Sequence, residues 1–314
     1  MPTHVASVYR RKTRLCRWYA SWCQTSRAVR SKSHNKSVTP ELSVDLLLHS
    51  PSISVRDIYC AGTCKGHSPE EHATATELVF PYRGIYVRHV GQDQSVAEAN
   101  QVLLFNRGQG YCVSHPVEGG DASLSLLLSP SLLAELSPVS LLVDRSEPTY
   151  KTQRLRVDTH TQSLLATLRH RLRQGVAAPL EAETLALELV QHTLGPRTAH
   201  IAGGSTGRQR LVDRAKLAVA SDLGRRWTLA EVAAEVRCSP VYLTQVFQQV
   251  EGIPLYRYQL RLRLARALDL LEEYEDLTQL SLDLGFSSHS HFSAAFRETY
   301  GKSPSAFKQS AMGR

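Results

Sequence analysis

The chain has 314 residues, 42% of them hydrophobic, and a formal net charge of +8. This length allows two domains with sizeable cores, but no apolar run approaches the ~18 residues that a membrane-spanning helix needs. The N-terminus has no apolar segment typical of secretion signals, and the six cysteines are too scattered for a disulfide framework. We therefore expect a cytoplasmic protein with no membrane partner.

The basic charge is concentrated at the N-terminus. Residues 1–40 contain nine Lys or Arg and no Asp or Glu, whereas residues 41–206 contain 13 basic and 17 acidic groups, and residues 207–314 contain 15 and 12. Residues 1–40 also lack a sustained apolar period, which predicts a disordered basic tail. Contact of this tail with DNA phosphates is an alternative that the sequence leaves open.

Short segments rich in β-branched and aromatic residues follow, from about residue 41 to about residue 150. Gly, Pro and Asn separate them roughly every ten residues, as is typical of a β-sandwich or β-barrel. From about residue 158 to 195 the apolar period is helical and predicts two amphipathic helices, each ending at a Gly. Their apolar faces are Leu164, Leu165, Leu168 and Leu172, and then Leu185, Leu189 and Val190. These faces pack either on their own domain or against a second subunit.

A helical region is predicted after a Gly- and Ser-rich segment, residues 199–210, which is typical of a flexible linker. Thr228 and Glu231 have the spacing of a capping box. Ser239 followed by Pro240 is a strong start for the next helix. A short helix, a turn and a second, capped helix together indicate a helix-turn-helix.

The same pattern occurs again 49 residues further on. Ser239, Leu243, Phe247 and Gly252 correspond to Ser288, Phe292, Phe296 and Gly301. The apolar members repeat at helical spacing, so we expect them in the core, with Ser287 or Ser288 as the cap of the second helix. Two copies are too few for a solenoid and indicate two similar units with a paired role.

A helix predicted to start at Pro254 and to run to about Glu273 connects the two copies. About 20 residues span about 30 Å, close to the ~34 Å between successive major-groove faces on one side of B-DNA. This spacing suggests that one rigid helix holds two reading units one DNA turn apart. The helix carries Arg257, Arg261, Arg263 and Arg266, which either neutralise phosphates or pair with nearby acidic residues.

The faces opposite the two apolar stripes are small and polar, as a helix in the major groove requires. Gln245 or Gln248 can read adenine there, and Arg297 can hold a guanine or a phosphate. The predicted DNA-binding residues are Ser239, Pro240, Tyr242, Thr244, Gln245, Gln248, Ser288, His289, Ser290, His291, Ser293 and Arg297.

The sequences LAEVAAEVRCSPVYLTQVFQQVEG, RLRLARALDLL and LGFSSHSHFSAAFRETYGKSPSAF resemble the AraC/XylS family of bacterial transcription regulators, over about residues 211–310. The resemblance implies seven helices, two helix-turn-helix units and sequence-specific promoter binding. The family often has a basic residue just before the aromatic that closes each recognition helix. Val246 and Ala295 occupy those positions here, which implies weaker phosphate anchoring. Residues from TELVFPYRGIYVRHV to YCVSHPVEGG resemble, less specifically, the family's cupin-like effector-binding and dimerising domain.

An alternative site consists of Cys60, Cys64, His67 and His72, with Cys112 and His115 further on. Such ligands can bind zinc or sense redox state, although no spacing matches a tight zinc signature. The alternative function is therefore a metal- or redox-sensing regulator that uses Cys60, Cys64 and nearby His. Enzyme motifs such as HExxH, the Walker loop and a GxGxxG after a strand are absent from the sequence, so no catalytic site is expected.

Together these patterns predict an α+β multidomain protein. The predicted parts are a basic tail at 1–40, a cupin-like β-barrel sensor and dimerisation domain with flanking helices at 41–198, a linker at 199–210 and an all-α double helix-turn-helix domain at 211–312. The predicted partners are double-stranded promoter DNA, RNA polymerase, an unidentified small-molecule effector and a second copy of the chain. We expect no cofactor and no bound metal.

Overall fold

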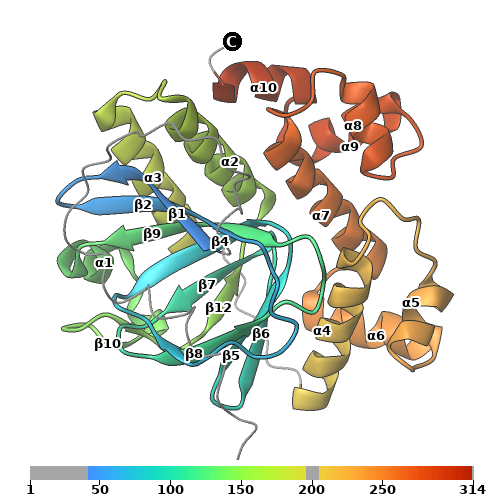
Figure 1. Ribbon diagram of the computed structural model, residues 1–314, viewed down its shortest axis with the longest axis horizontal. Helices are drawn as coiled ribbons and strands as arrows, with labels where there is room; N and C mark the ends of the chain where they lie inside the picture. The colour runs from blue at the N-terminus through green and yellow to red at the C-terminus, as the bar shows by residue number, and fades with distance from the viewer. Residues whose placement is uncertain (1–41, 196–204, 313–314) are drawn as a thin grey trace, which may run out of the picture. The chain divides into compact units, whose positions relative to one another are not determined.

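The computed structural model of the chain describes residues 42–195 and 205–312. The predicted basic tail and part of the predicted linker, residues 199–204, lie outside these ranges. The described residues form a β-rich region followed by a helical region (Figure 1). Within them, no helix combines the length and the apolar character needed to cross a membrane.

The β-rich region is built on a six-stranded antiparallel sheet with the strand order β1-β2-β9-β4-β7-β12. Its strands are β1 (Leu42–His49), β2 (Ile53–Cys60), β9 (Asp121–Leu128), β4 (Glu77–Arg83), β7 (Gln101–Phe105) and β12 (Arg154–Arg156). Every residue of β7 is buried, which is the pattern of a strand covered on both faces of its sheet.

A smaller sheet with the order β3-β8-β5-β6 accompanies the first. Its strands are β3 (Glu71–His72), β8 (Gly110–Ser114), β5 (Tyr86–Val90) and β6 (Asp93–Ala97), and a separate pair is formed by β10 (Leu142–Asp144) and β11 (Thr149–Tyr150). In the described residues no strand pair joins the two larger sheets into a closed barrel. The sandwich alternative of the sequence pattern therefore describes the sheets better than the barrel.

Two helices cover one face of the large sheet, α2 (Thr159–Gln174) and α3 (Pro179–Leu194) (Figure 1). Leu78 and Phe80 of β4 point into the core shared with these helices, whereas Val79 between them joins the core on the other face. This alternation is the period-two pattern of a strand. The apolar faces of α2 and α3 thus pack on their own region, as one of the two alternatives predicted.

Some elements differ from the sequence-based expectation. Helix α1 (Pro130–Leu136) and the short 3₁₀ helix η1 (Val139–Leu141) lie within the segment that reads as β-like. Ser129 caps α1 by accepting a hydrogen bond from the Leu132 N–H, a local signal that the apolar run conceals. Gly175 ends α2 in the left-handed conformation, but Gly195 after α3 is extended.

Seven helices form the helical region between residues 205 and 312, as the family resemblance implies. They are α4 (Thr206–Ala220), α5 (Leu229–Glu235), α6 (Pro240–Glu251), α7 (Leu255–Leu270), α8 (Leu277–Asp283), α9 (His289–Tyr300) and α10 (Pro304–Met312). The first helix begins at Thr206, so residues 206–210 of the predicted linker are helical; this turn is mostly exposed and precedes Leu211, the first residue of α4 in the core.

Helix α7 lies between the α5–α6 pair and the α8–α9 pair (Figure 1). Tyr258 and Leu262 in its first half belong to the core of the first pair, and Leu264 and Leu268 belong to the core of the second. Helix α7 ends at Leu270, three residues before the predicted end near Glu273. The chain turns after Leu270, where the Glu273 N–H donates to the Leu270 carbonyl. The 16 residues of α7 correspond to about 24 Å, shorter than the expected rod of about 30 Å.

Candidate nucleic-acid interface

The first helix-turn-helix is α5, a four-residue turn and α6, and its ends are set by local hydrogen bonds. The Thr228 hydroxyl accepts from the Glu231 N–H at 3.2 Å, and the Glu231 carboxylate accepts from the Thr228 N–H at 2.7 Å, which completes the predicted capping box. Hydrogen bonds from Thr228, together with Arg225, lower the pKa of Glu231 to about 2. At the next helix the Ser239 hydroxyl accepts from the Tyr242 N–H at 3.2 Å.

The second helix-turn-helix, α8 and α9, repeats this arrangement. Of the two predicted cap residues, Ser287 and Ser288, Ser288 caps α9: its hydroxyl accepts a hydrogen bond from the His291 N–H at 3.2 Å. Gly252 after α6 and Gly301 after α9 both end their helices in the left-handed conformation, with φ of 72° and 75°. The 49-residue repeat is thus a repeat of cap, helix and stop.

The apolar stripe of each capped helix is in the core. Leu243 and Phe247 of α6, and Phe292 and Phe296 of α9, have 0% of their surface exposed. Figure 1 shows the two helices on either side of α7, which contributes to both cores. Helices held in this way present only their opposite faces to solvent.

The predicted DNA-binding residues lie on those opposite faces. All of them are exposed except Ser293, which is partly buried. They are Ser239, Pro240, Tyr242, Thr244, Gln245 and Gln248 on or before α6, and Ser288, His289, Ser290, His291, Ser293 and Arg297 on or before α9. Their contact with bases remains a prediction, but their placement leaves them accessible to a groove.

Several of these side chains are engaged within their own helix. The Thr244 hydroxyl donates to the Pro240 carbonyl at 2.9 Å, and the Gln248 amide donates to the Gly252 carbonyl at 3.4 Å. The side chains of Gln245 and Arg297, in contrast, form no hydrogen bond or ion pair with other residues of the described ranges. Their polar groups are therefore accessible to a partner, as are those of Tyr242 and Ser290, which are also exposed.

The four arginines of α7 have different surroundings. Arg263 is structural: its guanidinium donates to the carbonyls of Leu223, Arg225 and Gly285, and so connects the loop before α5 to the turn of the second unit. Arg266 pairs with Asp269 on the same helix. Arg261 is partly buried, whereas Arg257 is exposed and donates only to the Tyr256 hydroxyl at 3.3 Å, which leaves most of its guanidinium accessible to a phosphate. The sequence did not reveal the role of Arg263, because its acceptors are backbone atoms distant in sequence.

The departure from the family pattern has a structural counterpart. Val246 and Ala295, which stand where the family often has a basic residue, are only 2% and 8% exposed. Neither position can therefore present a charge to phosphate. The turn of the first unit instead exposes Arg237, which adopts a left-handed backbone with φ of 57°, and this residue was missed by the sequence analysis.

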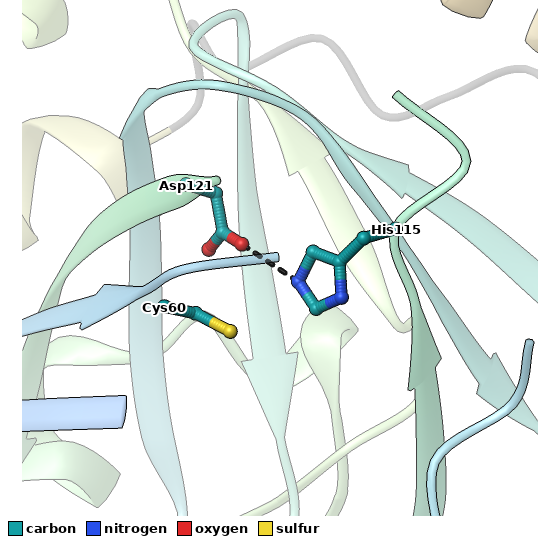
Figure 2. A group of neighbouring side chains, drawn as sticks. All are labelled: Cys60, His115 and Asp121. Carbon is teal, nitrogen blue, oxygen red and sulfur yellow. Dashed lines mark hydrogen bonds and ion pairs between the residues drawn. The ribbon is translucent and has the colours of Figure 1, made fainter. Parts of the chain in front are cut away.

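The cysteine and histidine residues of the alternative site do not come together as the sequence suggested. The ligand atoms of Cys60 and His115 lie within 4.8 Å of one another and of a carboxylate oxygen of Asp121, which was not predicted (Figure 2). Cys64, His67 and His72 are not part of this group. Hydrogen bonding to Asp121, with a further contribution from Cys60, raises the pKa of His115 to about 10 against the opposing effect of burial.

The helical region is similar in sequence to known transcription regulators. Residues 232–310 match the helix-turn-helix domain family. The chain is 28% identical over 112 residues to the Msm operon regulatory protein of Streptococcus mutans, covering 35% of this chain and 40% of that protein. It is 24% identical over 247 residues to the HTH-type transcriptional activator RhaS of Klebsiella pneumoniae, covering 77% and 87%. An AraC-type transcriptional regulator of Chromobacterium violaceum, known from its crystal structure, is 28% identical with a TM-score of 0.32, covering 34% and 96%.

The chain spans less than half the length of several curated relatives that it matches. The two capped helices, each following a short helix and a turn, define a double helix-turn-helix, a class of DNA-binding module. Residues 232–310 carry a helix-turn-helix domain of this class, and the relatives that the chain matches there are transcription regulators, in agreement with the resemblance to the AraC/XylS family.

Proposed function

We propose that this protein is a sequence-specific transcription regulator that binds promoter DNA through α6 and α9 and responds to a small molecule through its β-rich region. The observation that carries the proposal is the pair of capped helices, each buried on its apolar side and exposed on its polar side, which α7 ties into one unit. We propose a regulator and not an enzyme, located in the cytoplasm, with RNA polymerase and a second copy of the chain as further partners.

The proposed domains are a tail at 1–40, a cupin-like sensor at 41–198, a linker at 199–210 and the DNA-binding domain at 211–312. A cavity of about 460 Å³ supports effector binding, since it lies in the size range of small-molecule sites. Val87, Val96 and Leu217 supply apolar walls, and Arg210 and Arg214 outnumber the one acidic lining residue, Asp213, so that the charge of the lining is positive overall. These residues favour an effector with an apolar body and an anionic group.

Ion pairs between the β-rich and helical regions offer a route from effector to DNA. The Lys216 ammonium on α4 is completely buried, 2.7 Å from Glu251 at the end of α6 and 3.7 Å from Glu98 in the β-rich region. Arg156 of β12 donates to the Val250 carbonyl of α6. A shift of the β-rich region on binding its effector would act on α6 through these groups, because separating a buried charge from its partner is strongly unfavourable in free energy.

The experiment is DNase footprinting of the purified protein on its own upstream DNA, followed by binding titrations with two variants. We expect Gln245→Ala to cost on the order of 1–3 kcal/mol and to relax specificity at one base pair. Arg297→Ala should either relax specificity at one guanine, or weaken all sequences alike and reduce the salt slope by about 1.

Gln191→Ala on α3 and Arg145→Ala before β11 are the matched controls, because both are exposed and lie in the β-rich region. They should bind as the wild type does. If Gln245→Ala and Arg297→Ala also retain wild-type affinity and selectivity, α6 and α9 are not the reading helices.

A further inference from the structure

Three side chains with the chemistry of metal ligands converge at one end of the β-rich region (Figure 2). Cys60 is the last residue of β2 and Asp121 the first of β9, and the two are paired in register in the large sheet. His115 directly follows β8 of the small sheet. The site therefore lies where the two sheets come together, and it is distinct from the DNA-binding helices.

The donor set suits a divalent transition metal such as Zn²⁺. A thiolate, an imidazole nitrogen and a carboxylate oxygen are its usual ligands, at about 2.0–2.3 Å from the ion. A tetrahedral site built on these bond lengths places ligand atoms about 3.3–3.6 Å apart. The three ligand atoms already lie within 4.8 Å of one another, so small side-chain movements are enough to close them around an ion.

His115 and Asp121 form a hydrogen bond of 2.7 Å between Nε2 and Oδ2, as the dashed line in Figure 2 shows. This pair explains why two buried polar side chains are tolerated, but it does not explain why the sulfur of Cys60 is directed toward the same pair. An ion seated among the three groups would replace the proton of the imidazole Nε2 and that of the thiol, both of which pass to solvent.

The backbone around the three ligands is held in a fixed arrangement. Gly62, Gly84 and Gly120 all have positive φ, and a Cβ on Gly62 would lie 2.8 Å from the Cα of Gly120. A Cβ on Gly120 would overlap the Cys60 carbonyl oxygen. Close packing of this kind fixes the ends of β2 and β9 against one another, which is the pre-organisation that a metal site needs.

Neighbouring backbone groups also support the ligands directly. The Gly62 N–H donates to the Cys60 sulfur at 3.4 Å, and the His115 N–H donates to the Cys64 carbonyl at 2.8 Å. Supporting hydrogen bonds of this type orient ligands and stabilise a thiolate. His115 and Asp121 are 3% and 6% exposed, whereas Cys60 is partly buried and is the most accessible residue of the three.

We propose that Cys60, His115 and Asp121 form a binding site for a thiophilic divalent metal ion of the Zn²⁺ type. Three protein ligands leave the fourth tetrahedral position open to water or to a small anionic molecule. The ion links the end of β2 to the segment between β8 and β9, and thereby couples its binding to the packing of the two sheets. This proposal does not depend on the proposed DNA-binding function.

The test is a titration of the full chain with Co²⁺, a spectroscopic substitute for Zn²⁺, under anaerobic reducing conditions. Cys16 and Cys23 lie outside the described residues, so the titration uses a C16S/C23S background. We expect one equivalent of Co²⁺ to produce a sulfur-to-cobalt charge-transfer band with the visible bands of a tetrahedral site. One equivalent of Zn²⁺ should abolish these bands and raise the melting temperature.

Cys60→Ser should lose the charge-transfer band and the thermal shift, and Asp121→Asn should weaken Co²⁺ binding at least tenfold. Cys112→Ser is the matched control, since Cys112 is a partly buried cysteine on β8 outside the group; it should bind as the parent does. Circular dichroism checks that each variant is folded.

Either of two results overturns the proposal: no charge-transfer band in the parent protein, or a band that Cys60→Ser retains. Binding of promoter DNA by the same samples is measured separately. A protein that binds DNA but no Co²⁺ contradicts only the metal site, and one that binds Co²⁺ but no DNA contradicts only the regulator.

Discussion

The two helix-turn-helix units have the same framework and different exposed faces. Both consist of a seven-residue helix followed by a twelve-residue helix, and both longer helices begin at a Ser cap and end at a left-handed Gly. The two copies have the same residue type at the positions that begin and end these helices. Where a side chain meets only solvent they diverge, as with Gln245 on α6 and Ala294 at the corresponding position of α9.

The two cores also differ. In the first core, Phe247 contacts one aromatic ring, that of Tyr258 on α7, and the two ring centroids are 5.3 Å apart. Phe296 in the second contacts Phe292, Tyr300 and Phe307 at centroid distances of 4.8–6.0 Å. Edge-to-face aromatic pairs add stability beyond the area they bury, so the second core depends more strongly on a single ring.

The largest expected effect tests this difference. Phe296→Ala and Phe247→Ala should each lower the free energy of unfolding by about 3–5 kcal/mol, with Phe296→Ala at the upper end. Chemical denaturation followed by far-UV circular dichroism measures both losses. Leu282→Ala on α8 is the control, because this leucine is 51% exposed and its loss should be below about 0.5 kcal/mol. Equal losses in the two phenylalanine variants would show that the extra rings are not stabilising.

The turns of the two units differ at one equivalent position. In both turns the residue that follows the C-cap of the shorter helix has a left-handed backbone. This residue is Arg237 after α5, with φ of 57°, and Gly285 after α8, with φ of 78°. A Cβ on Gly285 would overlap the carbonyl oxygen of Gly224, in the loop before the first unit. The second turn therefore requires Gly because the loop before the first unit approaches it there, whereas the first turn tolerates a side chain.

Gly285→Ala should lower the free energy of unfolding by about 2–4 kcal/mol, from the strained backbone and the overlap with Gly224 together. Gly301→Ala separates these causes, because Gly301 has a φ of 75° and open space around its Cβ position, and it should lose only about 1–2 kcal/mol. Arg237→Gly should gain up to about 1 kcal/mol. Thermal and chemical unfolding of the three variants measure the order, and a Gly285→Ala protein as stable as Gly301→Ala contradicts the contact.

The sequence predicted those parts of the fold that short-range interactions determine. The caps at Thr228, Ser239 and Ser288 and the buried phenylalanines depend on residues three or four positions apart, and all were found in the structure. The end of α7 was placed three residues too late, because the apolar and charged pattern continues through a turn. There the Glu273 and Tyr274 N–H groups both donate to the Leu270 carbonyl.

Long-range pairing explains what the sequence did not predict. Cys60 meets Asp121 only because β2 and β9 pair in one register, and a shift of one residue would direct the two side chains to opposite faces. Cys64, four residues from Cys60, was a natural candidate by spacing, yet it lies outside the group. Similarly, Arg263 connects the loop before α5 to the turn of the second unit through backbone carbonyls, which any residue type can supply.

The smallest expected effect concerns the first helix of each unit. Helix α5 begins with the capping box of Thr228 and Glu231, whereas α8 begins at Asp276 and has Gln279 at the position equivalent to Glu231. The pKa of Glu231 is lowered from 4.5 to about 2 in the folded protein. A carboxyl with a depressed folded pKa contributes stability that is complete above the unfolded pKa and is lost as the pH falls through the folded one.

Glu231→Gln keeps a capping-box side chain but removes its charge, and so makes the first unit resemble the second. The stability difference between wild type and variant should be largest above about pH 4.5 and should disappear near pH 2. Hydrogen exchange of the α5 amides between pH 2 and pH 6 measures it, with the α8 amides as the internal control. Because the α8 amides have no partner in Glu231, their protection should be the same in both proteins at every pH. A gap at α5 that persists at pH 2 would mean that the Gln side chain fails as a cap, and that the charge of Glu231 is not what distinguishes the two helices.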